Sequence, residues 1–248
     1  MDLTGKRAIV CGSTQGIGKA CAMELASMGA SITLIARNEE SLGQVIKELS
    51  TSAKQDHHYL VADFTDSNAL KRAIEEYTSK NDVSILVNNT GGPSGGPILE
   101  AKTEEFTHAF SQHLICNHIL VQAVVEGMKK TKYGRIINII STSVKQPLKG
   151  LGVSNTIRAA VANWSKTLSM ELASFGITVN NVLPGMTDTS RITQLLENKS
   201  KKTGKTVEVL LKEMISEIPM GRTARPAEIA AAVGFLASPS ASYITGIN

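Results

Sequence analysis

The sequence predicts an α/β fold in which helices cover both faces of one doubly wound parallel sheet. Short runs rich in β-branched residues alternate with longer helical patterns, as in βαβ units. These runs lack a clean in-and-out alternation, which is expected for strands buried on both faces. A chain of 248 residues with 42% apolar residues fills one substantial core, so we expect a single domain over residues 1–248.

Six strands and six helices follow from this pattern. The apolar, β-branched runs predict strands at Arg7–Cys11, Ser31–Ala36, His58–Ala62, Ser84–Asn88, Arg135–Ile140 and Thr178–Leu183. The stretches with apolar residues at helical spacing predict helices at Ile17–Met28, Glu39–Leu49, Asn68–Ser79, Glu104–Met128, Asn155–Phe175 and Pro226–Leu236. Proline suits the first turn of the last helix, because an N–H there has no partner inside the helix.

Composition argues against several classes of protein. The sequence does not open with a charged leader and an apolar core, and its apolar runs are too short to cross a bilayer. The net charge of +4 is mild and spread along the chain, which argues against nucleic-acid binding. Three cysteines without paired spacing, Cys11, Cys21 and Cys116, suit a reducing compartment. We therefore expect a soluble, cytoplasmic protein that binds neither membranes nor nucleic acids.

A glycine-rich segment follows the first predicted strand and opens the first predicted helix. It has the spacing G-x-x-x-G-x-G and consists of Gly12, Ser13, Thr14, Gln15, Gly16, Ile17 and Gly18. Glycines let the backbone approach a diphosphate closely, and the N–H groups at a helix start attract the anion. The segment predicts a dinucleotide site. The alternative is a tight strand-to-helix turn without a ligand.

The end of the second strand indicates which dinucleotide is bound. An acidic residue at this position would bind the ribose hydroxyls of NAD and repel a 2′-phosphate. The sequence has Ala36 and Arg37 instead. Because a guanidinium can pair with a phosphate through two hydrogen bonds, Arg37 favours NADP(H) over NAD(H). The alternative is an ordinary solvated arginine in a loop.

Over essentially its whole length, the chain resembles the short-chain dehydrogenase/reductase family. Gly12, Gly16 and Gly18 match the glycine motif of that family, and Asn88-Asn89-Thr90-Gly91 resembles its N-N-A-G motif. Further matches are Asp63, the segment Gly134-Arg135-Ile136-Ile137-Asn138, and Pro184-Gly185 followed by Thr189. The resemblance implies a Rossmann-type fold, an oxidoreductase activity and an NADP(H) cofactor. The cofactor contacts it implies are Asp63 and Phe64 near the adenine, Asn89, Thr90 and Gly91 in the loop after the fourth strand, Pro184, Gly185 and Thr189 at the nicotinamide carboxamide, and Arg158 at the nicotinamide ribose.

The catalytic pattern of the family is largely replaced in this chain. The family uses an asparagine, a serine, a tyrosine and a lysine, the last two spaced four apart on one helix face. Aligning the fifth strand places Ser141 on the serine position, Ser154 on the tyrosine position, Arg158 on the lysine position and His113 on the asparagine position. The missing tyrosine matters, because it supplies the proton in carbonyl reduction and a serine hydroxyl is a much poorer acid.

Few residues remain as proton donors. Tyr133 precedes the fifth strand and is expected at the opposite end from Ser141, and the other three tyrosines fall outside the predicted site. His113 is a candidate, because imidazole titrates near neutrality. The alternative is a packed histidine with a single hydrogen bond. His113 and Cys116 are three residues apart, but no second pair completes a metal site, so we expect no metal.

Within the family, a divergent subgroup resembling 3-oxoacyl-carrier-protein reductases carries S-N-x-x-R in place of Y-x-x-x-K, as Ser154-Asn155-Thr156-Ile157-Arg158 does here. This resemblance implies an NADPH-dependent reductase of a small 3-oxoacyl or keto substrate. Ser141 would hold the carbonyl oxygen, and His113 or a bound water would supply the proton. The alternative is a catalytically silent NADP(H)-binding redox sensor or assembly protein.

Two segments are expected to shape the substrate site and one helix to form an interface. The glycine-rich stretch 91–97 follows the fourth strand, and residues 186–220 form a candidate lid with Lys199, Lys201, Lys202 and Lys205, a run that would favour an anionic substrate. Alternatively, residues 91–97 are only a flexible connection, and the lysine run is only a solvated turn between two helices. Apolar residues on nearly all sides of Asn155–Phe175 predict a subunit contact in a homodimer or homotetramer. The family continues through a seventh strand beyond the Thr245–Asn248 segment.

Overall fold

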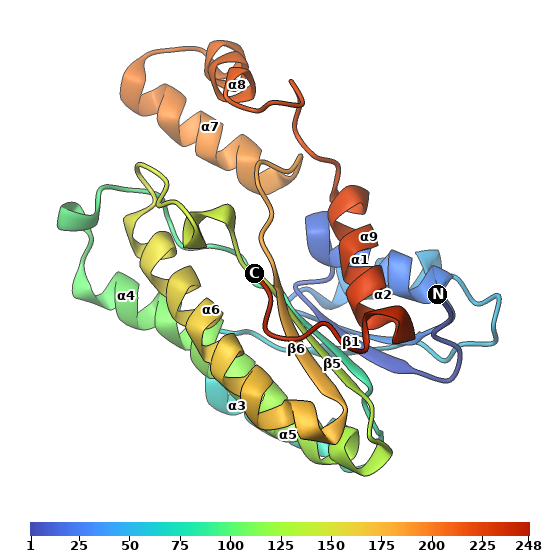
Figure 1. Ribbon diagram of the computed structural model, residues 1–248. Coiled ribbons are helices and arrows are strands. Elements are labelled where there is room, and N and C mark those ends of the chain that lie inside the picture. The colour runs from blue at the N-terminus through green and yellow to red at the C-terminus, as the bar shows by residue number, and fades with distance from the viewer.

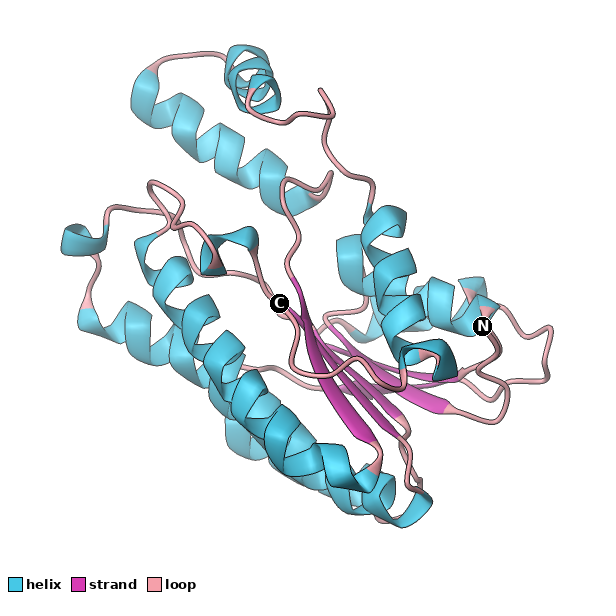
Figure 2. Ribbon diagram, in the orientation of Figure 1, coloured by secondary structure: helices cyan, strands magenta, loops and turns pink.

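The computed structural model describes residues 1–248 and contains one parallel six-stranded sheet (Figure 2). The strand order is β3-β2-β1-β4-β5-β6, and every neighbouring pair is parallel. The strands are β1 (Arg7–Cys11), β2 (Ser31–Ala36), β3 (His58–Val61), β4 (Ile85–Asn88), β5 (Gly134–Ile139) and β6 (Ile177–Val182). The order changes direction between β1 and β4, and this switch point opens the crevice in which such sheets bind ligands.

Helices cover both faces of the sheet (Figure 1). One face carries α1 (Gly16–Ser27), α2 (Glu39–Glu48) and α9 (Pro226–Ala237), and the other carries α3 (Ser67–Thr78), α5 (Cys116–Thr131) and α6 (Gly152–Leu172). Two buried apolar clusters of 22 and 18 residues fill the spaces between the sheet and these two layers. Cores of comparable size on both faces explain why the strands lack alternation, and they confirm the predicted fold class.

The predicted helix Glu104–Met128 is wrong as a single element. The structure divides it into α4 (Thr103–Phe110), a π-helical turn (Ser111–Ile115) and α5. A π turn contains one more residue per hydrogen-bonded turn than an α-helix and disturbs the periodicity of side chains only locally. The buried His113 lies at its centre. The predicted helix Asn155–Phe175 also begins earlier, at Gly152, so that Ser154 belongs to the first turn of α6.

Residues 186–220 contain two helices, α7 (Ser190–Thr203) and α8 (Val207–Ser216), which stand away from the sheet in Figure 1. The start of this segment pairs with the chain just beyond its end. The Asp188 N–H donates to the Ala224 carbonyl at 2.8 Å, and the Ala224 N–H donates to the Met186 carbonyl at 2.9 Å. The helix pair therefore leaves the body of the molecule through a hydrogen-bonded stem.

The last residues of the chain run along the free edge of β6. The Gly246 N–H donates to the Val179 carbonyl at 2.8 Å, and the Asn181 N–H donates to the Ile247 carbonyl at 3.0 Å. These hydrogen bonds satisfy backbone groups of an edge strand that would otherwise be open to pairing. No helix of the chain is both long enough and apolar enough to cross a membrane.

Three asparagines form a buried ladder across the carboxyl ends of β4, β5 and β6. Asn88 pairs in register with Asn138, and Asn138 pairs with Asn181. The Asn88 amide donates to Asn138 Oδ1 at 2.8 Å, and the Asn138 amide donates to Asn181 Oδ1 at 3.1 Å and to Ser165 Oγ of α6 at 2.9 Å. Because buried polar groups require such partners, the ladder fixes the strand register and the position of α6.

Candidate active site

The turn between β1 and α1, residues 12–18, requires glycine at three positions. Gly12 and Gly16 have φ values of +58° and +55°. A Cβ on Gly12 would lie 2.7 Å from the Asn89 carbonyl oxygen, and one on Gly18 would lie 2.1 Å from the Gly12 carbonyl oxygen. The Asn89 amide also donates to the carbonyl oxygens of Cys11, at 3.2 Å, and Gly12, at 3.3 Å. The turn is thus packed between α1 and the end of β4.

The start of α1 fits a bound diphosphate. Gln15 caps the helix without a side-chain hydrogen bond, and the first turn has no acidic residue. The first N–H groups are therefore free to bind an anion. Ser13 is buried, with its hydroxyl directed at the Ile35 carbonyl at 3.4 Å, while Thr14 is partly exposed and Ile17 packs on the core. These features support the dinucleotide interpretation over that of a turn without a ligand.

The segment after β6 covers this turn. A Cβ on Gly16 would lie 3.1 Å from Thr189 Cγ2, and the Ser190 hydroxyl donates to Gln15 Oε1 at 3.3 Å. At its other end the same segment contacts the loop after β5, where the Thr142 N–H donates to the Pro184 carbonyl at 3.3 Å. Pro184 and Thr189 thus connect the glycine turn, residues 12–18, with the loop that carries Ser141.

Arg37 lies at the end of β2 with a largely free side chain. Its side chain is 74% exposed, and its guanidinium lies 3.9 Å from the Asp63 carboxylate. Asp63 also accepts a hydrogen bond from the Thr65 N–H at 2.9 Å, and the Phe64 carbonyl accepts one from the Cys116 thiol at 3.4 Å. Because the ion pair is long and exposed, it holds Arg37 only weakly and leaves it able to bind a phosphate.

Beyond Asn89, the loop after β4 passes a histidine and two arginines. The Thr90 hydroxyl lies 2.5 Å from His113 Nδ1. A Cβ on Gly92 would lie 3.4 Å from Arg191 Nη2 and 3.7 Å from Arg158 Nη2. One face of this loop therefore contacts the nucleotide turn, and the other contacts a cluster of basic side chains.

Arg158 is a half-buried cation fixed by one backbone hydrogen bond. Its Nη1 donates to the Ile139 carbonyl at 2.8 Å, and no carboxylate pairs with it. Burial and the nearby Arg191 lower the pKa of Arg158 to about 10. The guanidinium remains protonated at neutral pH, so its positive charge is available to a ligand. Arg191 is fixed in turn by donation from its Nη2 to the Pro93 carbonyl.

His113 is 2% exposed, and its Nε2 has no hydrogen-bond partner. Burial and the charges of Arg158 and Arg191 lower its pKa to about 3. In the folded protein the imidazole is therefore neutral over the physiological pH range, rather than titrating near neutrality. Its hydrogen bond to Thr90, together with the nearby Gly91 backbone, matches the alternative of a packed histidine.

The two candidate serines occupy different settings. Ser141 caps a short 3₁₀ turn, Thr142–Val144, and its Oγ accepts a hydrogen bond from the Ser143 N–H at 3.1 Å. This bond fixes the oxygen and leaves the O–H proton free to donate. Ser154 is buried in α6, one turn before Arg158, and therefore faces the same way as that arginine.

None of the four tyrosines lies in this cluster. The hydroxyl of Tyr133 donates to the Ala237 carbonyl at 2.7 Å, that of Tyr59 donates to Glu39 at 3.1 Å, and that of Tyr77 lies 2.5 Å from the Thr33 hydroxyl. Tyr243 is 100% exposed. No tyrosine is thus positioned to replace the one missing at residue 154.

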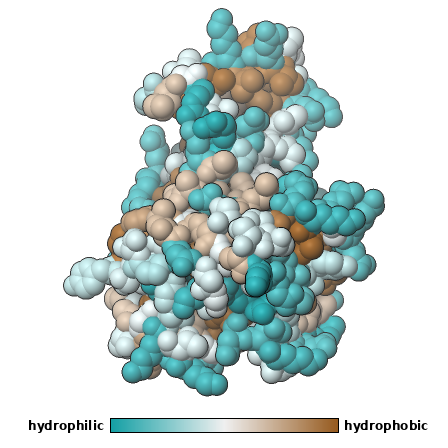
Figure 3. Space-filling view, turned by 90° about the vertical axis from the view of Figure 1, so that its right-hand side faces the viewer, coloured by the Kyte–Doolittle hydropathy of each residue, from teal (hydrophilic) through white to brown (hydrophobic).

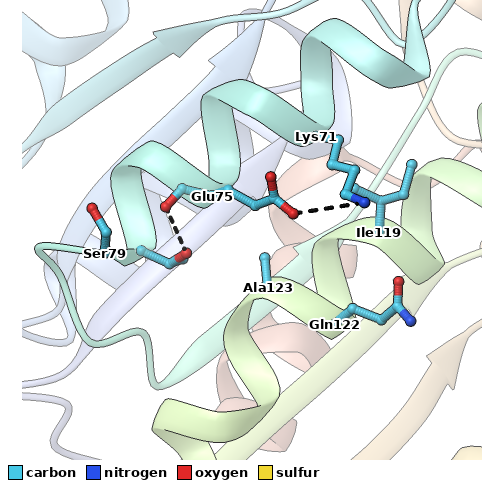
Figure 4. A pocket seen from close by; sticks show the side chains of 7 residues that line it. Lys71, Glu75, Ser79, Ile119, Gln122 and Ala123 are labelled. Atoms are coloured by element: carbon cyan, nitrogen blue, oxygen red, sulfur yellow. Dashed lines mark hydrogen bonds and ion pairs between the residues drawn. The ribbon is translucent and has the colours of Figure 1, made fainter.

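The structure also shows two hollows at other places. A depression of about 450 Å³ lies between α3 and α5, where Lys71 and Glu75 form a 3.8 Å ion pair (Figure 4), and none of the candidate residues lines it. A smaller one of about 160 Å³ lies where Lys202 of α7 approaches residues 94–97. The candidate lid and the glycine-rich loop are therefore neighbours.

Most of the predicted residues gather along one path at the carboxyl edge of the sheet. Gly12, Gly16, Gly18, Asn89 and Thr189 surround the first turn, whereas Thr90, His113 and Arg158 lie on the far side of the loop. Arg37, Asp63 and Phe64 lie apart, at the ends of β2 and β3. Arg191 was not predicted as a site residue from the sequence. Its only sequence signal is its place two residues after Thr189, at the start of the candidate lid.

A glycine turn at the switch point, beside a cluster of polar and basic side chains, is typical of the dinucleotide-binding α/β class. Residues 12–248 match the family model described as enoyl-(acyl carrier protein) reductase. The 3-oxoacyl-(acyl-carrier-protein) reductase of Vibrio cholerae is 34% identical over 249 residues, which cover 99% of this chain and 95% of the relative. An NADPH-dependent reductase of Bacillus subtilis is 32% identical over 246 residues, or 98% and 95% of the two chains.

Solved structures agree with these matches. The L-sorbose reductase of Gluconobacter frateurii, solved with NADPH and L-sorbose, superposes with a TM-score of 0.92 at 30% identity and covers 100% of this chain and 95% of its own. The chain belongs to the short-chain dehydrogenase/reductase family. The predictions of family, oxidoreductase class and Rossmann-type fold are confirmed.

The lowered pKa of His113 predicts a loss of stability in mild acid. Unfolding exposes the imidazole and returns its pKa to about 6.5, so the unfolded chain binds a proton that the folded chain excludes. The stabilisation is complete above pH 6.5 and is lost as the pH falls toward 3. Between pH 7 and pH 5 this group should lower the free energy of unfolding by about 2 kcal/mol.

Urea denaturation at the two pH values, on the native protein and on His113→Asn, measures this difference. The variant should show a loss that is smaller by about 2 kcal/mol. His108→Asn changes an exposed histidine of α4 and should behave as the native protein does. Equal losses in native protein and His113→Asn would mean that His113 does not exclude a proton in the folded state.

Proposed function

We propose that the protein reduces a small 3-oxoacyl or keto substrate with NADPH, at a site without the family tyrosine and lysine. The observation that carries the proposal is the segment from Pro184 to Thr189, which contacts the nucleotide turn at Gly16 and the Ser141 loop at Thr142. In this proposal, the residues that bind the cofactor and those that bind the substrate lie at the same edge of the sheet. The cofactor is NADP(H), and it supplies the hydride.

In this proposal the chain holds the cofactor through three regions. The first turn, from Gly12 to Gly18, receives the diphosphate, and Arg37 pairs with the 2′-phosphate beside Asp63 and Phe64. The remaining contacts are made by Asn89, Thr90, Gly91, Pro184, Gly185, Thr189 and, at the nicotinamide ribose, Arg158. Glycine geometry at the first turn and the exposed Arg37 side chain support these assignments.

Ser141 orients the carbonyl. Its Oγ is fixed by the Ser143 N–H, and its O–H is free to donate to the carbonyl oxygen. Arg158 adds a positive charge that stabilises the oxyanion as it develops, because a charge partly shielded from water acts more strongly than one in bulk solvent. Ser154, at the place of the family tyrosine, leaves room for the substrate or a water molecule beside Arg158.

A bound water molecule is the preferred proton donor. His113 is neutral at physiological pH and carries no imidazolium proton to give. Its unpartnered Nε2 can still orient such a water, since a neutral imidazole both donates and accepts hydrogen bonds. His113 and Ser154 thus act as positioning residues in this mechanism.

NADPH consumption by the purified protein tests the proposal directly. The assay uses a panel of 3-oxoacyl thioesters, diketones and keto sugars. Ser141→Ala should lower kcat/KM by about 100-fold or more, because it removes a donor to the developing oxyanion. Ser174→Ala, at an exposed serine after α6, serves as the matched control and should leave the rate unchanged. NADPH binding without turnover of any compound would instead support a silent redox sensor or assembly protein, which the absence of a tyrosine from the site favours.

We further propose that residues 186–220 form a lid on the single domain 1–248. The helix pair α7–α8 leaves the body through the stem at Asp188 and Ala224. Figure 3 shows apolar side chains gathered on this projecting part. Val207, Val209 and Met220 are exposed there at 36%, 45% and 73%. An apolar surface of this kind is buried when a lid closes over a ligand.

Limited trypsin digestion tests the lid. Cleavage after the lysines of α7 and its following turn, Lys199, Lys201, Lys202 and Lys205, should slow severalfold when NADPH and a substrate are added, because closure removes these bonds from the protease. Lys54, in the exposed loop after α2, is an internal control whose cleavage should not change. Unchanged cleavage in both regions would argue against closure.

Assembly and location complete the proposal. The apolar residues of α6 mostly face the core, and its outer face is mixed: Ala159 and Met170, the latter 70% exposed, lie beside Asn163 and Lys166. This mixed face would form the contact of a homodimer or homotetramer. Light scattering should give twice or four times the chain mass of 26.4 kDa, and a monomer at micromolar concentration would contradict the contact.

Cys11, Cys21 and Cys116 are free and buried, which supports a cytoplasmic location that cell fractionation can check.

A further inference from the structure

We propose that the substrate carries an anionic oxyacid group, a carboxylate in the first instance, which binds between Arg158 and Arg191 beside Gly92. The protein would thus act on keto acids in preference to neutral ketones. The inference deepens the proposed reductase function and rests on it for the reaction, but the binding of the anion can be measured without turnover.

The first argument is the uncompensated charge of the two arginines. Neither guanidinium has a carboxylate within ion-pair distance, although both Arg158 and Arg191 are half-buried. Burying a cation without a counter-charge is costly, and placing two together adds repulsion. The two are close enough for Arg191 to lower the pKa of Arg158. A bound anion would remove both penalties.

The second argument is the geometry around Gly92. Arg158 uses its Nη1 for the Ile139 carbonyl, and Arg191 uses its Nη2 for the Pro93 carbonyl. Each guanidinium has five N–H donors, so several remain for a ligand. The place where a Cβ of residue 92 would stand is 3.4 Å from Arg191 Nη2 and 3.7 Å from Arg158 Nη2. Glycine at this position keeps the space beside the two guanidiniums open.

The third argument is the orphaned nitrogen of His113. Its Nε2 is buried without a hydrogen-bond partner, and both arginines lie near enough to disfavour its protonation. A buried polar atom of this kind indicates a missing ligand group or water. Because the imidazole is neutral, its Nε2 can donate, when Nδ1 accepts from the Thr90 hydroxyl, either to the anion directly or to the bound water that bridges to it.

The lysines of the lid are weaker candidates for the same role. Lys205 already pairs with Glu213 at 2.5 Å. Lys202 lines its hollow together with Glu100 and Glu105, whose carboxylates offset its charge. The anion preference that the lysine run suggested is therefore better assigned to Arg158 and Arg191.

The anionic group takes no part in the chemistry. Hydride adds to the carbonyl carbon, a proton adds to the carbonyl oxygen, and NADPH is oxidised to NADP⁺, while the oxyacid group leaves the site unchanged. Its role is to hold the substrate with the carbonyl at Ser141, and interactions of this kind raise the rate by positioning.

Two matched pairs of compounds test the proposal. Acetoacetate and its methyl ester differ in one carboxylate charge, and dihydroxyacetone phosphate and dihydroxyacetone differ in a phosphate. Calorimetric titration uses the NADP⁺-loaded protein, which cannot reduce them. Acetoacetate should bind about 10- to 100-fold more tightly than its ester, the range expected for charge-assisted hydrogen bonds. A preference only within the second pair would assign the oxyanion site to a phosphate rather than a carboxylate.

Arg191→Gln should reduce the preference for the acid to about twofold or less, because it removes one of the two charges while keeping a hydrogen-bonding side chain. Arg191→Lys should retain part of it. Arg72→Gln, at an exposed arginine of α3, is the matched control and should retain all of it. The proposal is overturned if neither anion binds more tightly than its neutral partner, or if Arg191→Gln keeps the full preference.

NADPH oxidation measured with the same compounds distinguishes failure of the anion site from failure of the reductase function. Preferential binding of the acid with no oxidation of NADPH would leave the anion site intact and reject the reductase function. Turnover of both members of a pair with equal kcat/KM would keep the reductase and reject the anion site.

Discussion

The approach of the first turn to Asn89 is the constraint on which the rest of the structure depends. Gly12 lies so close to the Asn89 backbone, and Gly18 so close to Gly12, that neither position has space for a Cβ. The Asn89 amide reinforces this contact by donating to the carbonyls of Cys11 and Gly12. Since the chain runs from β1 and from β4 into opposite halves of the sheet, the contact fixes where the crevice opens and which loops line it.

Polar side chains hold the neighbouring half of the sheet in position. The ladder of Asn88, Asn138 and Asn181 joins three strands at the edge where the site lies, and Ser165 extends it to α6. The same helix carries Ser154 and Arg158. A shift of one residue in β5 would break the ladder and misplace these side chains together, so strand register and site geometry are coupled.

The sequence predicted the sheet well, because its strands are continuous apolar runs between polar turns. All six predicted strands agree with the structure to within a residue or two at each end. The π turn and the two helices of residues 186–220 were not predicted. A π turn shifts the apolar pattern by a single residue, so the break between α4 and α5 left no clear signal. Residues 186–220 are mostly polar, and α7 and α8 bury one leucine each, Leu196 and Leu210, which left too few apolar positions to predict either helix.

Within the candidate site, chain order predicted the glycine turn but not the electrostatics. Arg191 is 33 positions from Arg158 in the sequence, and only the fold places both beside Gly92. The charge state of His113 depends on that same juxtaposition together with burial. A pKa set by neighbours across the fold cannot be predicted from residue type, whereas a motif that binds through its own backbone can.

The π turn at Ser111–Ile115 also has an evolutionary consequence. A π turn differs from an α turn by one residue, and each residue of an α-helix advances by about 100° around the axis. The wider turn absorbs this extra residue, so loss of a single residue here would restore a continuous helix, leave α4 and α5 in place and change only the side chains presented within the turn. One small deletion or insertion can therefore exchange the residue presented to Thr90, and a lineage can change the polar lining of its pocket without altering any strand of the sheet.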